Sequence, residues 1–584
     1  MTMDLRGVGR QVFGVNTSLM QAKESACKTL YQYTEDLGEG FAPHAPETLA
    51  VVLPNLGPMN TVGVQVISAA IVPRLVGLVA RRAAAAVKVN AGAGRKATFP
   101  VAELREAQAM LDASMDALTE VISRLSGNGN GNEGGQQQQE EPAERENQER
   151  ACVAVDSLSN LLEGRCGVVG CVEAGTWPSQ QQQQQQQQPE VLSISNERLT
   201  KVVTVLRDAA VASIRRSGGR LARAYAASAA GLEGLGGMTG AVDAAELQEL
   251  EDGEEELLVS VVDATGWMIK GGKEAFLPTF EAVMRPLILP LLDTSAPASV
   301  LASHRSFGLC MAIDVLEHCG DGGRRSVFPE TLLPALLRGC REDEPDASTK
   351  QACAYGLGVA ADLGGQDFEP HSAEALRLLL ALVAKGRLES GGDSGDDGDD
   401  DGEVWGEGAV TDNAISAALR VVVARPGPVF GAFAAGALVG SLLDALPLTV
   451  DVAEGRVCHR RVVDLALARH ELFFGGGGIG GDAAAHAAAI VPKLVSAIAG
   501  MLEYQPSARE KEMAAAALPC GGYRAGGGEG NDSEEELWAR QLVDRETRQK
   551  AEQVLAALKA AFPKEFEQAW AGLGDTKRRA MQMP

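Results

Sequence analysis

The chain has 584 residues, enough for several domains or one long repeat array. Apolar residues make up 45% of the sequence and aromatic residues only 4%, so its core must consist mainly of Ala, Leu and Val, which favours closely packed helices over sheets. The formal net charge of −25 repels phosphate backbones, which argues against general nucleic-acid binding; it favours basic partners, with solubility alone as the alternative.

Three further features narrow the class of protein. The ten cysteines contain no Cys-x-x-Cys pair and lie in apolar stretches, which is typical of a reducing compartment. The first 20 residues carry no apolar segment of the kind found in secretory signals. The uncharged run 426–443 is short and rich in Gly and Ala, so we expect a buried helix pair there rather than a membrane span.

Apolar residues recur every three or four positions along most of the chain, which predicts helices. The first expected helix carries one apolar stripe, formed by Leu19, Ala22, Ala26, Leu30, Tyr33 and Leu37. A turn and a second helix over 49–56 follow, and a similar two-helix unit spans 258–291 with a turn at 270–276. Further helices are expected to begin near residues 299, 331, 349, 372, 412, 457 and 483. No alternating strand pattern competes with them.

Once insert-like segments are set aside, the unit recurs about every 40 residues, the period of HEAT and armadillo repeats. The sequence therefore predicts an all-α, HEAT/armadillo-type helical-repeat solenoid with long disordered inserts. Within one expected helix, which Pro345 and Asp346 begin, glycine costs about 1 kcal/mol per position relative to alanine. We expect close packing against the next repeat to offset this cost through the small residues Ala352, Ala354, Gly356 and Gly358.

Composition divides the chain into repeats and inserts. Repeats are expected over 1–125, 191–390 and 409–520, with C-terminal helices over 537–584. A low-complexity region rich in Gln, Gly and Glu covers 126–190 and includes a possible short helix over 150–164. An acidic disordered loop is expected over 390–408 and another disordered loop over 521–536, because these segments lack the apolar residues of a core.

Candidate catalytic and ligand-binding motifs fail on spacing. Cys310 and His318 are two helical turns apart, about 12 Å along the axis, too far for a nucleophile and its base. Asp314, Glu317 and His318 are more simply explained as the solvated face of a buried helix. The acidic run from Asp397 fits the start of a calcium loop but has glycine where the bidentate glutamate should stand.

Two glycine-rich stretches are also better explained as turns. "GWMIKGGKE" resembles a phosphate-binding loop with its lysine one position late, and no strand precedes it. "GGGGIGG" matches a dinucleotide-binding pattern only because nearly every residue is glycine. We therefore predict no catalytic residues, no cofactor and no metal ligands, and the chain is not expected to be an enzyme.

Several stretches resemble the C-terminal half of the importin-β (karyopherin-β) nuclear transport receptors, and the importin-5 subfamily most of all. They are "FGLCMAIDVLEHCG", "QACAYGLGVAADLGG" and "LDALPLTVDVAEGRV", with "SLMQAKESACKTLYQYTEDLGEGF" resembling an earlier repeat. "ARHELFFG", "IVPKLVSAIAGMLE" and "RQKAEQVLAAL" resemble the last repeats. Together they cover about residues 16–80 and 246–562 in the order of the family, whereas about 81–245 resembles it poorly.

The resemblance implies a superhelix of paired A and B helices. Basic cargo proteins with nuclear localisation signals would bind the concave face, and phenylalanine-glycine nucleoporins the convex face. The GTPase Ran would release cargo by binding N-terminal repeats, which have no counterpart here because family members are nearly twice as long, so Ran is expected as a partner only if those repeats exist. Lys350 stands where the family's repeat helix usually carries a basic residue.

The predicted function is therefore a segment of a nuclear transport receptor that shuttles between cytoplasm and nucleus through the pore, with no direct nucleic-acid binding and no membrane insertion. An acidic surface would capture basic cargo, and the candidate residues are Glu251, Asp252, Glu254, Glu255 and Glu256. The acidic run 393–403 is a second candidate, and solvated flexible loops are the alternative for both segments. Two other functions stay open: a HEAT-repeat scaffold of another complex, and an enzyme with a helical body.

Overall fold

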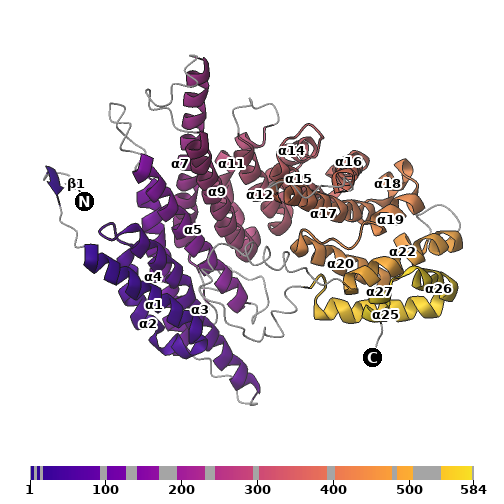
Figure 1. Ribbon diagram of the computed structural model, residues 1–584, viewed down its shortest axis with the longest axis horizontal. Coiled ribbons are helices and arrows are strands. Elements are labelled where there is room, and N and C mark those ends of the chain that lie inside the picture. Colours follow the sequence, from indigo (N-terminus) through magenta and orange to yellow (C-terminus); the bar gives the residue numbers. More distant parts are fainter. Residues whose placement is uncertain are drawn as a thin grey trace. The chain divides into compact units, whose positions relative to one another are not determined.

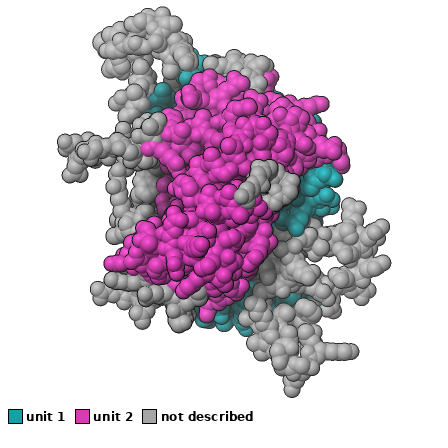
Figure 2. Space-filling view, turned by 90° about the vertical axis from the view of Figure 1, so that its right-hand side faces the viewer, with its two compact units in different colours: residues 1–291, 296–323 teal, residues 292–295, 324–584 magenta. Residues whose placement is uncertain are grey.

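The computed structural model describes residues 2–5, 9–12, 17–92, 101–126, 141–169, 192, 194–229, 244–293, 301–390, 401–475, 483–503 and 541–581. The chain divides into two compact units, coloured separately in Figure 2. Unit 1 comprises residues 1–291 and 296–323, and unit 2 comprises 292–295 and 324–584. Each unit is a stack of helix pairs, which confirms the predicted HEAT/armadillo-type repeat fold.

Unit 1 begins with an antiparallel hairpin that the sequence pattern did not predict, and the elements that the structure describes after it are helices. The strands are β1 (Thr2–Leu5) and β2 (Gly9–Val12), paired from Thr2↔Val12 to Leu5↔Gly9. The helices are α1 (Thr17–Asp36), η1 (Gly38–His44), α2 (Ala45–Val52), η2 (Leu53–Leu56), α3 (Val62–Gly92), α4 (Val101–Ser126), α5 (Glu141–Val169), α7 (Asn196–Ala229), α9 (Ala244–Gly272), η5 (Lys273–Phe276), α10 (Leu277–Thr279), the π-helical turn η6 (Phe280–Met284), α11 (Arg285–Leu291) and α12 (Ala302–His318).

The helices of unit 1 form two rows. Helices α3, α5, α9 and α12 pack one against the next, and α4 and α7 pack side by side over them. Figure 1 shows this succession from indigo to magenta. Each helix pair leaves an apolar face that the next pair covers, which is how repeat arrays build a continuous core.

Unit 2 has the same two-row plan. Its helices are α13 (Gly320–Val327, which begins in unit 1), α14 (Leu332–Gly339), α15 (Ala347–Leu363), η7 (Gly365–Asp367), η8 (Glu369–His371), α16 (Ser372–Ser390), α17 (Asp401–Ala424), α18 (Pro426–Ala432), α19 (Ala435–Leu443), α20 (Val452–Leu467), α21 (Glu471–Phe474), α22 (Ala483–Glu503), α25 (Arg545–Ala561), α26 (Pro563–Gly572) and α27 (Asp575–Ala580). Helices α15, α17, α20 and α25 form one row, while α16, α18, α19, α22 and α26 form the other.

The predicted apolar stripe of the first helix does not face the core. Leu19, Tyr33 and Leu37 are 62%, 50% and 55% exposed, and α1 instead buries Cys27 and Thr34 against unit 1. The periodicity correctly predicted the helix but not its orientation, because apolar residues occur on both faces.

Helix boundaries differ from the predicted inserts in two places. Helix α5 runs over Glu141–Val169, longer than the short helix expected at 150–164, and α17 begins at Asp401, inside the predicted loop 390–408. Residues 391–400 and 521–536, and most of 126–190 outside α5, lie outside the described residues.

Within the described residues, two helices are long and apolar enough to cross a membrane, by length and composition alone: Val62–Ala83 of α3 and Ala483–Glu503 of α22. In each of these segments 61% of the apolar window is buried against other helices, as expected for members of a helix row. The uncharged run 426–443 forms the helix pair α18 and α19, which meet at 104°. The pair is buried as expected in α19, whereas α18 buries only Val429.

Candidate functional site

The acidic segment 246–256, the main candidate for cargo binding, lies within helix α9 rather than in a flexible loop. Leu250, Leu257, Leu258 and Val261 recur at helical spacing and are buried, and this apolar face fixes the helix in its row. The acidic residues between them are therefore divided between a face buried in the stack and a face exposed to solvent.

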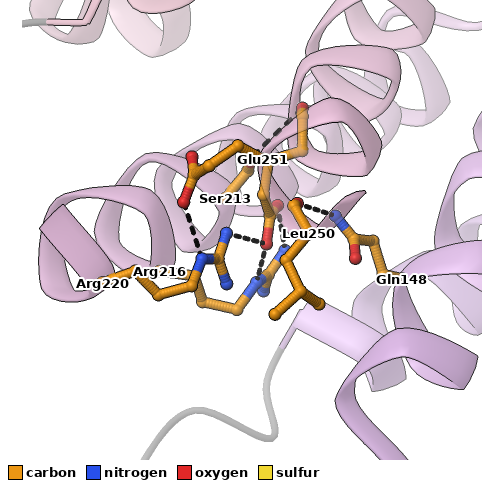
Figure 3. A network of polar contacts seen from close by, with 7 residues as sticks. Gln148, Ser213, Arg216, Arg220, Leu250 and Glu251 are labelled. Carbon is orange, nitrogen blue, oxygen red and sulfur yellow. Dashed lines mark hydrogen bonds and ion pairs between the residues drawn. The ribbon is translucent and has the colours of Figure 1, made fainter. Parts of the chain in front are cut away.

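Glu254 is on the buried face. Its side chain is 2% exposed, and its two oxygens accept hydrogen bonds from Arg216 Nε at 2.6 Å and Arg216 Nη2 at 2.7 Å. Arg220 Nη2 adds a third bond at 3.2 Å (Figure 3). This two-point pairing with a guanidinium is the strongest form of carboxylate recognition in proteins. The expectation that Glu254 offers its carboxylate to cargo is therefore not supported, because α7 already satisfies that group.

Glu251 belongs to the same network. Arg220 Nε donates to its Oε1 at 2.7 Å, and its side chain is half-buried. Gln148 of α5 donates to the carbonyl oxygen of Leu250 at 3.1 Å, and Ser213 of α7 donates to that of Glu254 at 3.4 Å (Figure 3). The network thus joins α5, α7 and α9 through groups that burial would otherwise leave unsatisfied.

The other three candidates lie on the exposed face of α9. Asp252, Glu255 and Glu256 are exposed, and their spacing places them on one face of the helix. Val259, one turn further along, is 53% exposed on the same side. This exposed stripe of α9 combines concentrated negative charge with an apolar residue, a surface suited to a basic segment that also carries an apolar side chain.

The small residues of the predicted repeat contact lie in α15. Ala354, Gly356 and Gly358 are buried and Ala352 is half-buried. A Cβ atom at Gly358 would lie 2.9 Å from Arg420 Cδ and 3.2 Å from Ala417 Cα, both in α17. At this position only glycine allows α15 and α17 to approach this closely.

Helix α15 begins after Asp346, as the sequence predicted. Asp346 is the N-cap and accepts the backbone N–H of Thr349 at 2.6 Å. Lys350, whose side chain is 2% exposed, lies 3.3 Å from Glu407 Oε1, and Lys385 approaches the same oxygen at 3.2 Å. The basic residue singled out by the resemblance is thus buried and pairs with the half-buried Glu407, which joins α15 to α17.

Sequence reasoning missed a polar network that joins α15, α17 and α20. Asp451, the N-cap of α20, accepts the N–H of Glu454 at 3.0 Å and side-chain amides from Asn413 at 2.8 Å and Gln351 at 3.2 Å. Asp412 accepts the N–H groups of Val450 and Asp451, and burial raises the pKa of Asp412 to about 6. The aspartate before "VAEGRV" is a cap signal, but nothing in the sequence indicated its partners.

The rejected catalytic motifs stay without support. Burial raises the pKa of the Cys310 thiol to about 11, so this sulfur is not the thiolate that a nucleophile requires. Gly266 lies inside α9 and residues 401–408 lie inside α17, so neither a phosphate loop nor a calcium loop forms there. Residues 397–400 lie outside the described residues. Asp314, Glu317 and His318 converge on one face of α12.

No protein-family model matches the sequence. The chain is 29% identical to importin-4 of Mus musculus over 183 residues and 26% identical to importin-4 of Homo sapiens over 187 residues, 31% of this chain in each case. It covers only 14% of the length of each importin-4 sequence.

Solved structures of the karyopherin Kap121p are similar at low identity. Kap121p bound to RanGTP matches with a TM-score of 0.48 at 15% identity, over 86% of this chain and 37% of Kap121p. Kap121p bound to Ste12p matches with a TM-score of 0.49 at 15% identity, over 86% of this chain and 36% of Kap121p. At this level the structural similarity is not by itself evidence of a shared function. The match to importin-4 confirms the resemblance to importin-type (karyopherin-β) transport receptors, without support for the importin-5 subfamily in particular.

Proposed function

We propose that the chain is a non-catalytic segment of a nuclear transport receptor that binds protein cargo. The sequence similarity to importin-4 carries this proposal, because it amounts to 29% identity over 183 residues. The fold agrees with it, since stacked helix pairs provide long surfaces for protein partners.

Basic cargo with a nuclear localisation signal is the proposed ligand class. The exposed stripe of α9 supports this, because Asp252, Glu255 and Glu256 present three carboxylates on one face of a rigid helix. The overall charge of −25 would steer basic proteins toward the chain. The segment 393–403 remains a further candidate, although its first eight residues lie outside the described part of the chain.

Transport also needs contact with the pore. We propose that the chain binds phenylalanine-glycine nucleoporins and is found in cytoplasm, nucleus and at the nuclear envelope, as its similarity to importins implies. Kap121p, for comparison, has been solved bound to Nup53p and to RanGTP. Ran is proposed as a partner only together with N-terminal repeats of the kind that hold it in the family.

The alternative is a HEAT-repeat scaffold of another complex, and pore binding discriminates between the two. In a pull-down, purified chain should be retained on beads carrying a phenylalanine-glycine repeat fragment, and a fluorescent fusion should concentrate at the nuclear rim. A matched fragment with its phenylalanines changed to serine serves as the control. Equal retention on both beads, together with a diffuse fusion, would favour the scaffold.

A further inference from the structure

Three side chains on one face of α12 bring an imidazole and two carboxylates together. They belong to Asp314, Glu317 and His318, and one ligand atom from each lies within 4.8 Å of the others. The spacing i, i+3 and i+4 produces this convergence on a helix. Ligand atoms that share one tetrahedral ion at bond lengths near 2.1 Å lie about 3.4 Å apart, so small side-chain rotations would complete the arrangement.

The neighbouring helix leaves room for this cluster. Gly266 of α9 lies opposite, and a Cβ atom there would be only 2.8 Å from Asp314 Oδ2. Every other residue type would therefore push against the carboxylate. A glycine inside a helix lowers the stability of that helix. The space that Gly266 leaves for the Asp314 carboxylate explains why glycine occupies this position.

Two of the three side chains, those of Asp314 and His318, have no hydrogen-bond partner within the described part of the chain. Among the described residues, no ion pair involves either side chain. Burial raises the pKa of Asp314 to about 6 and lowers the pKa of His318, as expected for groups removed from water. Carboxylate oxygens and imidazole nitrogens are both common ligands of divalent cations, so the convergence of these three side chains is the observation that points to an ion.

Charged groups around the cluster leave it negative. Asp263 and Lys270 of α9 and Lys273 of η5 act on it electrostatically. The ammonium of Lys270 lies 5.1 Å from the centre of the Trp267 ring, in a cation–π contact on its own helix. Two ammonium groups do not balance the three carboxylates of Asp263, Asp314 and Glu317.

We propose that Asp314, Glu317 and His318 bind one divalent transition-metal ion of the zinc class, with the remaining coordination positions open to water or to a partner's side chain. Imidazole nitrogen combined with carboxylate oxygen suits zinc-like ions, whereas magnesium and calcium prefer oxygen ligands alone. The proposal does not depend on the transport function.

Titration of the metal-stripped full chain with zinc sulfate in a calorimeter tests the site. We expect one zinc ion per chain with a Kd below about 100 µM. Magnesium should give no heat of binding under the same conditions. His318→Asn should weaken zinc binding at least tenfold, because it removes a ligand. Absence of zinc binding by the unmodified chain in this range would overturn the proposal.

Gly266→Ala sharpens the test because it removes no ligand atom. It should weaken zinc binding by displacing Asp314, whereas Gly253→Ala, the same change on the same helix facing Gln148, should leave the affinity unchanged. Circular dichroism verifies that each variant is folded. If folded Gly266→Ala and His318→Asn both bind zinc as tightly as the unmodified chain, the ion is held elsewhere and the proposal is wrong.

Discussion

The α7–α9 contact in unit 1 and the α15–α17 contact in unit 2 each hold two neighbouring helices together, but by different interactions. In unit 1, the carboxylate of Glu254 and the guanidinium groups of Arg216 and Arg220 meet in a buried charged network. In unit 2, Gly358 lets the backbones approach closely, with Lys350 and Glu407 pairing at one end of the contact.

The comparison shows why acidic composition is a poor guide to a binding surface. The segment 246–256 is one acidic block in the sequence, but helix α9 places some of its side chains in the core of the stack and the others in solvent. Glu254 stabilises the stack, while Asp252, Glu255 and Glu256 face solvent. Only the three exposed carboxylates can bind a partner while Glu254 keeps its ion pairs with Arg216 and Arg220.

The largest effect is expected from Glu254→Ala. It leaves Arg220, which is 6% exposed, buried without one of its counter-charges, and breaking such a pair costs about 3–5 kcal/mol. Urea denaturation monitored by circular dichroism measures the change. The exposed Asp252→Asn is the matched control and should change stability by less than about 0.5 kcal/mol. Equal effects of the two variants would show that the charged network does not hold unit 1 together.

A pH titration contrasts this charged network with a neutral one in unit 2. His459 of α20 is fully buried, accepts the N–H of Leu448 at 3.0 Å and lies 3.0 Å from the carbonyl oxygen of Leu542, and burial lowers its pKa to about 4. A pKa below that of the unfolded chain means that stability is complete above about pH 6.5 and is lost as the pH falls toward 4. The loss should reach about 3 kcal/mol.

His459→Asn isolates this contribution. Asp156, Asp314 and Asp412 have pKa values raised to about 6 and act in the opposite direction, so the variant and the unmodified chain must be compared across the same pH range. We expect the variant to be less stable at pH 7 but to lose less stability on acidification. Parallel curves would contradict a neutral buried His459.

Gly358→Ala tests the close contact between α15 and α17. The added methyl group would meet backbone as well as side-chain atoms of α17, and overpacking of this kind costs about 1–3 kcal/mol. Thermal denaturation should show a lower midpoint. No change in the midpoint would mean that α17 can move away at no cost, so that Gly358 is not needed for packing.

The smallest and opposite effect is expected from Gly218→Ala in α7. A Cβ atom there meets nothing within 4 Å, so the variant should gain up to about 1 kcal/mol from helix propensity alone. The same thermal assay, run beside Gly358→Ala, separates propensity from packing. A loss of stability at Gly218 would show that propensity does not account for the difference between the two glycines.

The sequence predicted the helices well because the apolar period and the cap signals are local. Asp346 caps α15 as expected, and the contact made by Gly358 follows from its place among small residues. The exposed stripe of α1 and the pairing of Glu254 with Arg216 were not predictable in the same way. Both depend on which face of a helix its neighbours cover, and Arg216 is 38 residues from its partner.

Binding of a fluorescent, lysine-rich nuclear-localisation peptide to the purified chain, followed by anisotropy, tests the central claim most directly. The account predicts binding that weakens as salt rises from about 0.05 to 0.5 M, and that weakens further when Asp252, Glu255 and Glu256 are changed together to their amides. The fold should be unaffected by this change, because these side chains are exposed. No binding, or binding that depends on neither salt nor these three carboxylates, would contradict the account.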